Sequence, residues 1–140
     1  MAEESTPPDV VELTRRGFEA ANRHDLDALM GFFASEAVYD LSDLGLGIFE
    51  GRAAIRRFVE DWWGTWGDHL IDLEELLDLG CGVVFTAIRE DGRLRGSDGH
   101  VEQRRGWIFV WAWGMIDRFT AYLDIDEGRA GAEHLAEERG

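Results

Sequence analysis

The hydrophobic residues in the first half of the chain recur at helical spacing in three segments. Residues 9–22, 26–33 and 51–66 each carry apolar side chains three or four positions apart, as an amphipathic helix does. Asp25 is a typical N-cap for the second segment. A short apolar strand is expected at residues 37–41, between the second helix and the third. This part of the chain therefore predicts three helices, each with one buried face.

Beyond residue 66 the pattern changes to that of strands. The segments 69–79, 82–89, 101–113 and 115–124 are rich in β-branched and aromatic residues, and glycines separate them. They predict a long antiparallel meander. In the third of these segments both faces are apolar, because two sets of side chains alternate: Trp107, Phe109 and Trp111 with Ile108 and Val110.

The chain is expected to end in a helix. Asp124, followed by Glu127, resembles a capping box, but Gly128 and Gly131 should weaken the helix and let the tail fray. Helices followed by a meander are typical of an α+β fold in which the helices cover one face of a strongly curved antiparallel sheet. We expect one cone-shaped domain over residues 9–140, after a flexible leader at residues 1–8.

Composition indicates a folded acidic protein. The net charge is -15, yet 45% of the residues are hydrophobic and the chain holds six Trp and eight Phe. Such a charge repels phosphate backbones and anionic lipids, so neither nucleic acid nor a membrane is expected as a partner, which leaves a small molecule or another protein. A single cysteine, Cys81, excludes an internal disulfide, and the N-terminus lacks the features of a signal peptide. We therefore expect a cytoplasmic protein.

Asp40 is the best candidate for chemistry. It ends the short strand within the stretch EAVYDLSDLGLGIFEGRAAIRRF and precedes a glycine-rich loop and a helix. It can act as a general base, as a non-catalytic polar group in a pocket, or as a turn residue that accepts backbone N–H bonds. Arg105 can anchor a ligand carboxylate, pair with Asp40 or lie exposed at a strand edge. The aromatic residues can form a plain core or a binding platform.

Other motifs are weaker. Gly45, Gly47 and Gly51 approach a dinucleotide-binding fingerprint, but that motif needs a parallel βαβ unit. The segment 97–100 holds Ser, Asp and His, but these crowd into one turn without a nucleophile elbow. The four histidines have no paired ligand spacing. We therefore expect no metal and no cofactor.

The order of elements, the stretch around Asp40 and Gly51, and the ending WIFVWAWGMIDRFTAYLDIDEGRAGAEHL resemble the SnoaL-like branch of the nuclear transport factor 2-like superfamily over nearly the whole chain. The resemblance implies a cone-shaped, cystatin-like α+β fold. The superfamily holds polyketide cyclases, ketosteroid isomerases, epoxide hydrolases, dehydratases and non-enzymes, so the fold does not determine the reaction.

The resemblance also implies site residues. Asp40 falls where ketosteroid isomerases have their general base, but Gly17 and Trp107 replace their two oxyanion donors. Ala121 stands where the epoxide hydrolases have a catalytic Asp, and a SnoaL-type acid/base would be Asp117 or Asp124. The residues expected to bind substrate in the cavity beside Asp40 are Gly17, Phe58, Trp62, Arg105, Trp107, Phe109, Phe119, Ala121 and Leu123.

Two functions compete on these grounds. The first is a non-catalytic domain that binds a small apolar or cyclic ligand in an aromatic-lined cavity. The second is a cofactor-independent enzyme of cyclase, isomerase, dehydratase or hydrolase type with Asp40 as general acid/base, whose pKa should be raised unless Arg105 pairs with it. A homodimer is expected through an outward apolar face of the sheet, formed by Ile108, Val110, Thr120 and Tyr122.

Overall fold

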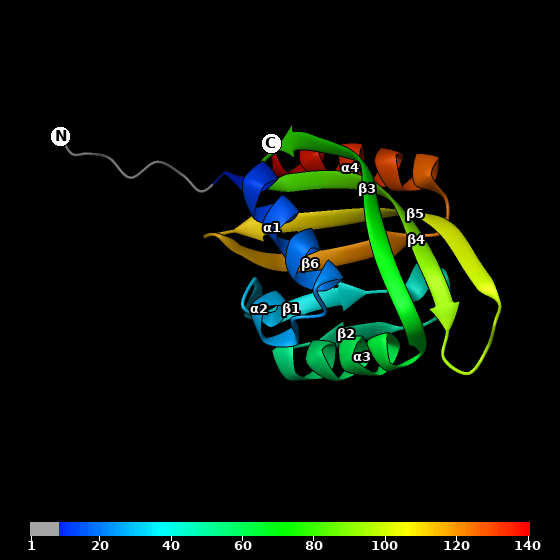
Figure 1. Cartoon of the computed structure of the whole chain (residues 1–140). Coiled ribbons are helices and arrows are strands. Elements are labelled where there is room, and N and C mark those ends of the chain that lie inside the picture. Colours follow the sequence, from blue (N-terminus) through cyan, green and yellow to red (C-terminus); the bar gives the residue numbers. More distant parts are fainter. Residues whose placement is uncertain (1–8) are drawn as a thin grey trace.

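The computed structural model describes residues 9–140, so the predicted leader at residues 1–8 lies outside the described residues (Figure 1). In the described part, helices and strands follow one another in the order α1 (Val10–Asn22), α2 (Leu26–Met30), β1 (Phe33–Asp40), a 3-10 helix η1 (Ser42–Leu44), β2 (Ile48–Glu50), α3 (Arg52–Gly64), β3 (Trp66–Gly80), β4 (Val83–Leu94), β5 (His100–Ala112), β6 (Met115–Tyr122) and α4 (Ile125–Arg139).

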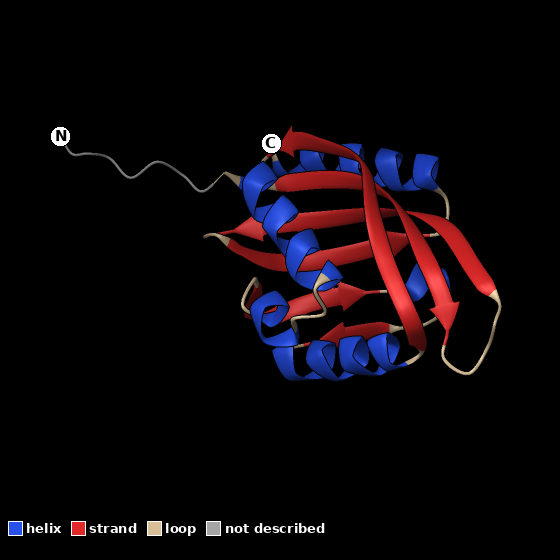
Figure 2. Ribbon diagram, in the orientation of Figure 1, coloured by secondary structure: helices blue, strands red, loops and turns tan. Residues whose placement is uncertain are grey.

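The three predicted N-terminal helices are present. Asp9 caps α1 by accepting the backbone N–H of Val11 at 3.0 Å, and Asp25 caps α2 by accepting that of Ala28 at 3.1 Å. The second helix is shorter than expected, because Phe33 already begins β1. Together α1, α2 and α3 cover one face of the sheet (Figure 2), and their apolar sides form the main core with the strands.

The six strands form one sheet in the order β2-β1-β6-β5-β4-β3. The predicted α+β class is confirmed, and β3 to β6 form the expected antiparallel meander. The sheet is nevertheless mixed, because β1 runs parallel to β6. These two strands stand far apart in the chain, so no hairpin sets their relative direction. The three-residue edge strand β2 was not predicted.

The prediction that the C-terminal tail frays is wrong. Helix α4 spans 15 residues and lies on the opposite face of the sheet from α1 (Figure 1). A Cβ atom at Gly128 would lie 3.3 Å from the Cα of Gly106 and 3.3 Å from the ring of Phe85. The glycine therefore lets the helix approach the sheet closely, and the burial of Ala132 beside it outweighs the poor helix propensity of glycine.

The same helix removes the reason for expecting a dimer. Ile108 and Val110 are each only 3% exposed, and Ile108 packs with Phe85 and Ala132 under α4. The expected bare apolar face is therefore absent at these two positions, since the chain covers it with its own helix. A homodimer stays a prediction without that support. Within residues 9–140, no helix is both long and apolar enough to cross a membrane.

The far edge of the sheet bends over the helices. Strand β3 pairs with β4 along its whole length, with irregular register at three points, and such bulges bend and twist a strand. The two strands come unusually close at Gly92, where a Cβ atom would lie 2.2 Å from the carbonyl oxygen of Asp68. This bend brings the first residues of β3 toward α1 and α3 and helps to enclose a cavity.

Candidate functional site

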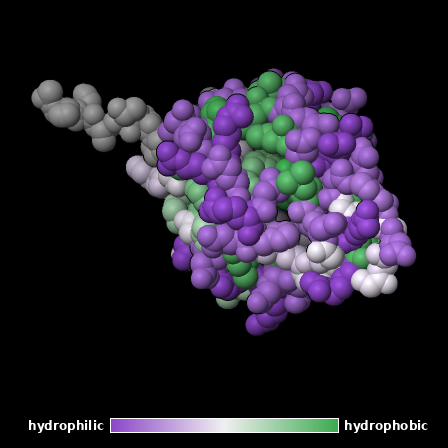
Figure 3. Space-filling view, viewed as in Figure 1, coloured by the Kyte–Doolittle hydropathy of each residue, from purple (hydrophilic) through white to green (hydrophobic). Residues whose placement is uncertain are grey.

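A cavity of about 320 Å³ lies between the helices and the inner face of the sheet. Its wall is largely aromatic and aliphatic. The few polar side chains in it come from α1, β1, β3, β4 and β5, and they are Thr14, Tyr39, His69, Glu90, Gln103 and Arg105. Figure 3 shows hydrophobic residues gathered toward the middle of one face and surrounded by hydrophilic ones.

All nine side chains or positions expected to bind substrate lie in this wall: Gly17, Phe58, Trp62, Arg105, Trp107, Phe109, Phe119, Ala121 and Leu123. The aromatic rings among them pack against one another, with Trp107 and Phe119 edge to face at 5.2 Å and Phe109 and Phe119 at 5.1 Å between ring centroids. Such mutual packing holds the wall in one arrangement. That these residues bind a ligand stays a prediction.

The mouth of the cavity lies beside η1 and the end of β6. Leu46 and Leu123 both line the cavity and are about half exposed. The carboxylate of Asp43, within η1, accepts the backbone N–H of Leu123 at 2.9 Å and so ties the two sides together. Apolar side chains that are both exposed and part of the wall indicate where the cavity opens to solvent.

The prediction that Asp40 lines the cavity is wrong. Its neighbour Tyr39 lies in the wall instead, because successive residues of a strand point to opposite faces. The Asp40 carboxylate accepts hydrogen bonds from the backbone N–H of Ser42 at 3.0 Å, from the Ser42 hydroxyl at 2.6 Å and from Arg118 at 2.7 Å. Of the three interpretations of Asp40, this geometry supports the turn residue.

The expected rise in the pKa of Asp40 is also wrong. Partial burial alone would raise it, but the hydrogen bonds from Ser42 and the charge of Arg118 outweigh burial and lower the pKa. Arg105 takes no part in this, since it donates to Gln103 at 2.8 Å and to the backbone carbonyl of Arg104 at 2.8 Å. Asp40 is therefore a stably ionised structural carboxylate outside the cavity.

The polar centre of the cavity is a buried pair formed by His69 of β3 and Glu90 of β4. The Nε2 atom of His69 lies 2.7 Å from the Glu90 carboxylate, and the two side chains are only 1% and 6% exposed. Two further donors reach the same carboxylate, the indole N–H of Trp62 at 3.1 Å and the amide of Gln103 at 3.0 Å. Donors from three elements thus compensate the cost of burying a charge.

These contacts set the protonation states in the cavity. Burial alone would raise the pKa of Glu90, but the hydrogen bonds from His69, Trp62 and Gln103 outweigh it, and the pKa lies below its usual range. Burial, and then the negative charge of Glu90, raise the pKa of Tyr39 above its usual range. The cavity therefore combines a carboxylate anion with a neutral phenol that remains a hydrogen-bond donor.

This arrangement leaves capacity for a ligand. A carboxylate offers about four acceptor positions. At Glu90 donors fill three of these positions, so one remains for a ligand. Among residues 9–140, no hydrogen bond engages the Tyr39 hydroxyl. The site can thus accept one proton or hydrogen bond from a ligand and donate another.

Sequence reasoning missed His69, Glu90, Gln103 and Tyr39. A signal was present, because Glu90 is a charged residue at the end of the apolar run VVFTAIRE. Ile71 pairs with Glu90 across the hairpin, so His69 is the diagonal neighbour of Glu90 on the same face.

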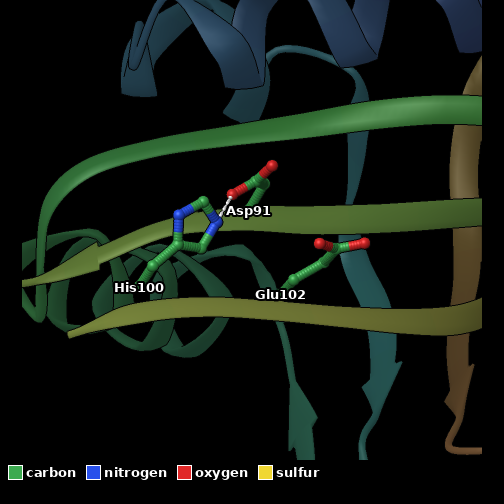
Figure 4. A group of neighbouring side chains, drawn as sticks. All are labelled: Asp91, His100 and Glu102. Carbon is green, nitrogen blue, oxygen red and sulfur yellow. Dashed lines mark ion pairs between the residues drawn. The ribbon is translucent and has the colours of Figure 1, made fainter.

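A second group of side chains gathers outside the cavity. Asp91, His100 and Glu102, from β4 and β5, bring their ligand-type atoms within 4.8 Å of one another (Figure 4). Their spacing in the sequence does not reveal this proximity, because the three residues come from two different strands. His100 is ion-paired with Asp91, and Glu102 faces Arg89 at 3.6 Å. These partly exposed carboxylates therefore already have side-chain partners within the chain itself.

Solved structures share the fold but little sequence. An NTF2-like protein of unknown function from Burkholderia pseudomallei matches with a TM-score of 0.72 and 15% identity, over 84% of this chain and 92% of that one. SalBIII, an epoxide hydrolase/cyclase-like enzyme with a role in pyran ring formation in the polyether salinomycin, matches with a TM-score of 0.72 and 20% identity, over 84% and 92%. TerC, co-crystallised with polyporic acid, matches with a TM-score of 0.71 and 14% identity, over 91% and 99%. The expected nuclear transport factor 2-like fold is thereby confirmed, while the activity is not.

At the level of sequence, the chain matches one family of domains. No curated protein sequence matches the chain. The family model described as the SnoaL-like domain matches residues 14–122, a stretch that includes most of α1, all six strands and every cavity-wall residue except Leu123. The resemblance seen in the sequence is therefore confirmed, and the chain belongs to the family of SnoaL-like domains.

Proposed function

We propose that the protein binds a small, largely apolar ring compound in its aromatic cavity. The observation that carries this proposal is the cavity itself, with its aromatic wall and a single buried polar centre at Glu90 and His69. Ligand sites in proteins span about 300–1,000 Å³ and combine apolar walls with a few polar groups that orient the ligand. A cavity of about 320 Å³ suits a compound of one or two rings.

The neighbouring structures support a small-molecule ligand. One of them acts in pyran ring formation, and another was co-crystallised with polyporic acid. The wall residues that we assign to binding are the nine named above. Rings of Phe58, Trp107 and Phe119 would contact the faces of the ligand, and Arg105 and Leu123 would lie near the mouth.

A second candidate function is acid/base catalysis without a cofactor, with Glu90 in the place first given to Asp40. Glu90 would accept a proton from the bound compound, and the Tyr39 hydroxyl would donate a hydrogen bond to the oxygen on which negative charge develops. The specific observation in favour is that Tyr39 and Glu90 both line the same largely apolar cavity, where the charge of Glu90 contributes to the raised pKa of Tyr39. A buried donor and acceptor of this kind are strongest where water is excluded.

The test of binding fills the cavity without disturbing the fold. A Cβ atom at Gly17 has no neighbour within 4 Å, and this position lies in the wall, so Gly17→Leu places a side chain in the ligand space. Gly64 of α3 is equally open and lies outside the wall, so Gly64→Leu is the matched control. We expect neutral 2-naphthol to quench the tryptophan fluorescence of the wild type with a saturable curve.

Gly17→Leu should weaken that binding at least tenfold, which corresponds to about 1.4 kcal/mol. Gly64→Leu should bind as the wild type does, and both variants should unfold in urea at concentrations no lower than the wild type, because leucine is the better helix former. Absence of saturable binding by 2-naphthol and by other neutral one- and two-ring compounds would contradict the proposal. So would equal effects of the two substitutions.

A further inference from the structure

Two histidines and a carboxylate form a continuous row at the polar centre. Nε2 of His69 faces Glu90 at 2.7 Å, and Nδ1 of His69 faces Nε2 of His24 at 3.5 Å. The two imidazole planes differ by only 10°, and their centroids lie 5.7 Å apart. That separation is close to the distance between the two nitrogens plus one ring radius at each end. The rings therefore lie edge to edge in nearly one plane, the geometry in which a proton passes between them.

The two ends of the row lie in different surroundings. Glu90 and His69 line the apolar cavity, whereas His24 is exposed in the turn between α1 and α2. His24 lines a separate polar depression whose other residues are Arg23, Asp25, Leu26, Asp27 and Arg56. The charges in that depression balance in pairs, Arg56 with Asp27 at 2.5 Å and Arg23 with Asp25 at 3.7 Å. The row therefore leads from solvent to the interior by a path other than the mouth.

The backbone at His24 takes a conformation that usually belongs to glycine. The N–H of His24 donates to the carbonyl of Ala21, and that of Asp25 donates to the carbonyl of Ala20, both at 3.0 Å. This pair of bonds is a Schellman motif, in which the residue at the position of His24 is usually glycine. His24 takes the left-handed conformation that the motif needs, with φ of 55°. A side chain with a Cβ is disfavoured there, so the chain accepts some backbone strain to place an imidazole at this position.

Other contacts hold His24 against His69. The Asn22 side chain both accepts the N–H of Ile71 and donates to its carbonyl, each at 2.8 Å, which clamps the end of α1 to β3 two residues beyond His69. The ring of Trp63 packs on His24 at 4.9 Å between centroids. Burial, and then the neighbouring His69, lower the pKa of His24, so its ring releases a proton readily.

We propose that His24 relays protons between the solvent and the His69–Glu90 pair, so that the cavity exchanges protons while a ligand closes its mouth. Protonated His24 gives its Nε2 proton to Nδ1 of His69, and His69 gives its own Nε2 proton to Glu90. Glu90 is then neutral, and both imidazoles are left as neutral Nδ1–H tautomers. The reverse transfer removes a proton from Glu90 and restores the starting tautomers. The forward transfer therefore brings one proton into the cavity, and the reverse transfer takes one proton out. The contact of 3.5 Å is long, as apo catalytic contacts often are, and shortens when the proton moves.

The relay would serve the acid/base catalysis by Glu90 that is the second candidate function, and in that sense it rests on the proposed function. The test of the relay needs no ligand. The rate at which Nδ1 of His69 gains and loses a proton is measured by ¹⁵N relaxation dispersion, at a pH where both forms are populated. His24→Gln fills a similar volume and carries no proton, and it should slow that rate at least tenfold. His134→Gln, an exposed histidine on α4, is the control and should leave the rate unchanged.

A second variant tests the same proposal by rescue. His24→Gly supplies the residue that the motif prefers, so it should unfold in urea at a concentration at least as high as the wild type. With the imidazole removed, the His69 exchange rate should rise in proportion to added imidazole, whereas the wild-type rate should not. A wild-type rate in His24→Gln, or no response of His24→Gly to imidazole, would overturn the relay. Failure of 2-naphthol and of the other neutral one- and two-ring compounds to bind would overturn the proposed function and leave these rates unaffected.

Discussion

Replacement of Glu90 by glutamine keeps the shape of the side chain and removes its charge. In the wild type one carboxylate oxygen accepts from His69 and Trp62, and the other accepts from Gln103. A carboxamide has only one oxygen, so its NH₂ group must face at least one of these donors. Gln103 cannot turn its own amide round to compensate, because its oxygen already accepts from Arg105 at 2.8 Å. At least one donor, which is partly buried at Trp62 and at Gln103, therefore loses its partner.

The size of the loss follows from these contacts. An unsatisfied buried donor costs about 1–3 kcal/mol, and the remaining hydrogen bonds lose the strength that the charge gave them. We expect Glu90→Gln to lower the free energy of unfolding by about 2–4 kcal/mol at pH 7. Because Trp62 contacts Glu90 directly, tryptophan fluorescence during urea unfolding reports the change. Glu74→Gln is the matched control, since Glu74 pairs with Arg104 on the surface and should cost less than about 1 kcal/mol.

The pH dependence of this difference has a definite sign. The pKa of Glu90 is lower in the folded chain than its ordinary value, so the folded protein favours the ionised form. The stability that the charge contributes is therefore complete above the unfolded pKa of about 4.3 and is lost as the pH falls through the lower folded pKa. The difference in the free energy of unfolding between the wild type and Glu90→Gln should therefore become smaller in acid. A loss below about 0.5 kcal/mol at pH 7, or one equal to that of Glu74→Gln, would refute the reasoning.

Two further predictions concern sites outside the cavity. Asp40→Asn weakens the contacts with Ser42 and Arg118, so it should lower the free energy of unfolding by about 1 kcal/mol and leave 2-naphthol binding unchanged; weaker binding in a titration would restore Asp40 to the site. Gly82→Ala should cost at least about 2 kcal/mol more than Gly96→Ala in urea unfolding. Both glycines have φ near +80°, but only at Gly82 would a Cβ atom meet a backbone oxygen, that of Trp111 at 2.3 Å. Equal losses would show that this contact is unimportant.

The positions of most helices and strands could be predicted because local signals determine them. The cap Asp25, the helical spacing of apolar residues and the alternation in β5 are each signals within one element. The parallel pairing of β1 with β6 and the packing of Gly128 on Gly106 depend on residues distant in the chain. Helix propensity alone marks Gly128 as unfavourable, whereas in the folded chain its lack of a side chain allows α4 to contact the sheet. Such long-range effects have no local sequence signal.

The candidate site divides in the same way. Alternation places Trp107 and Phe109 on one face of a strand whose two faces are both apolar, and the resemblance to SnoaL-like proteins is what assigned that face to the cavity wall. Asp40 was assigned to the cavity face of β1 together with Val38, whereas the structure places Tyr39 in the wall instead. His69 and Glu90 were missed because their meeting depends on the hairpin register between β3 and β4, which bulges make irregular.

The placement of the cavity carboxylate on β4 rather than β1 has an energetic reason. A buried carboxylate survives only where donors converge on it, since burial alone disfavours its charge. At Glu90 they arrive from α3, β3 and β5, and His69 of β3 reaches it because the register of β3 with β4 puts the two residues diagonally opposite on one face. On β1 the cavity residue is Tyr39, whose hydroxyl costs far less to bury than a charge. A carboxylate there would add a second negative charge to the same cavity. The convergence of donors from α3, β3 and β5 is therefore what makes a charged centre possible in an otherwise apolar cavity.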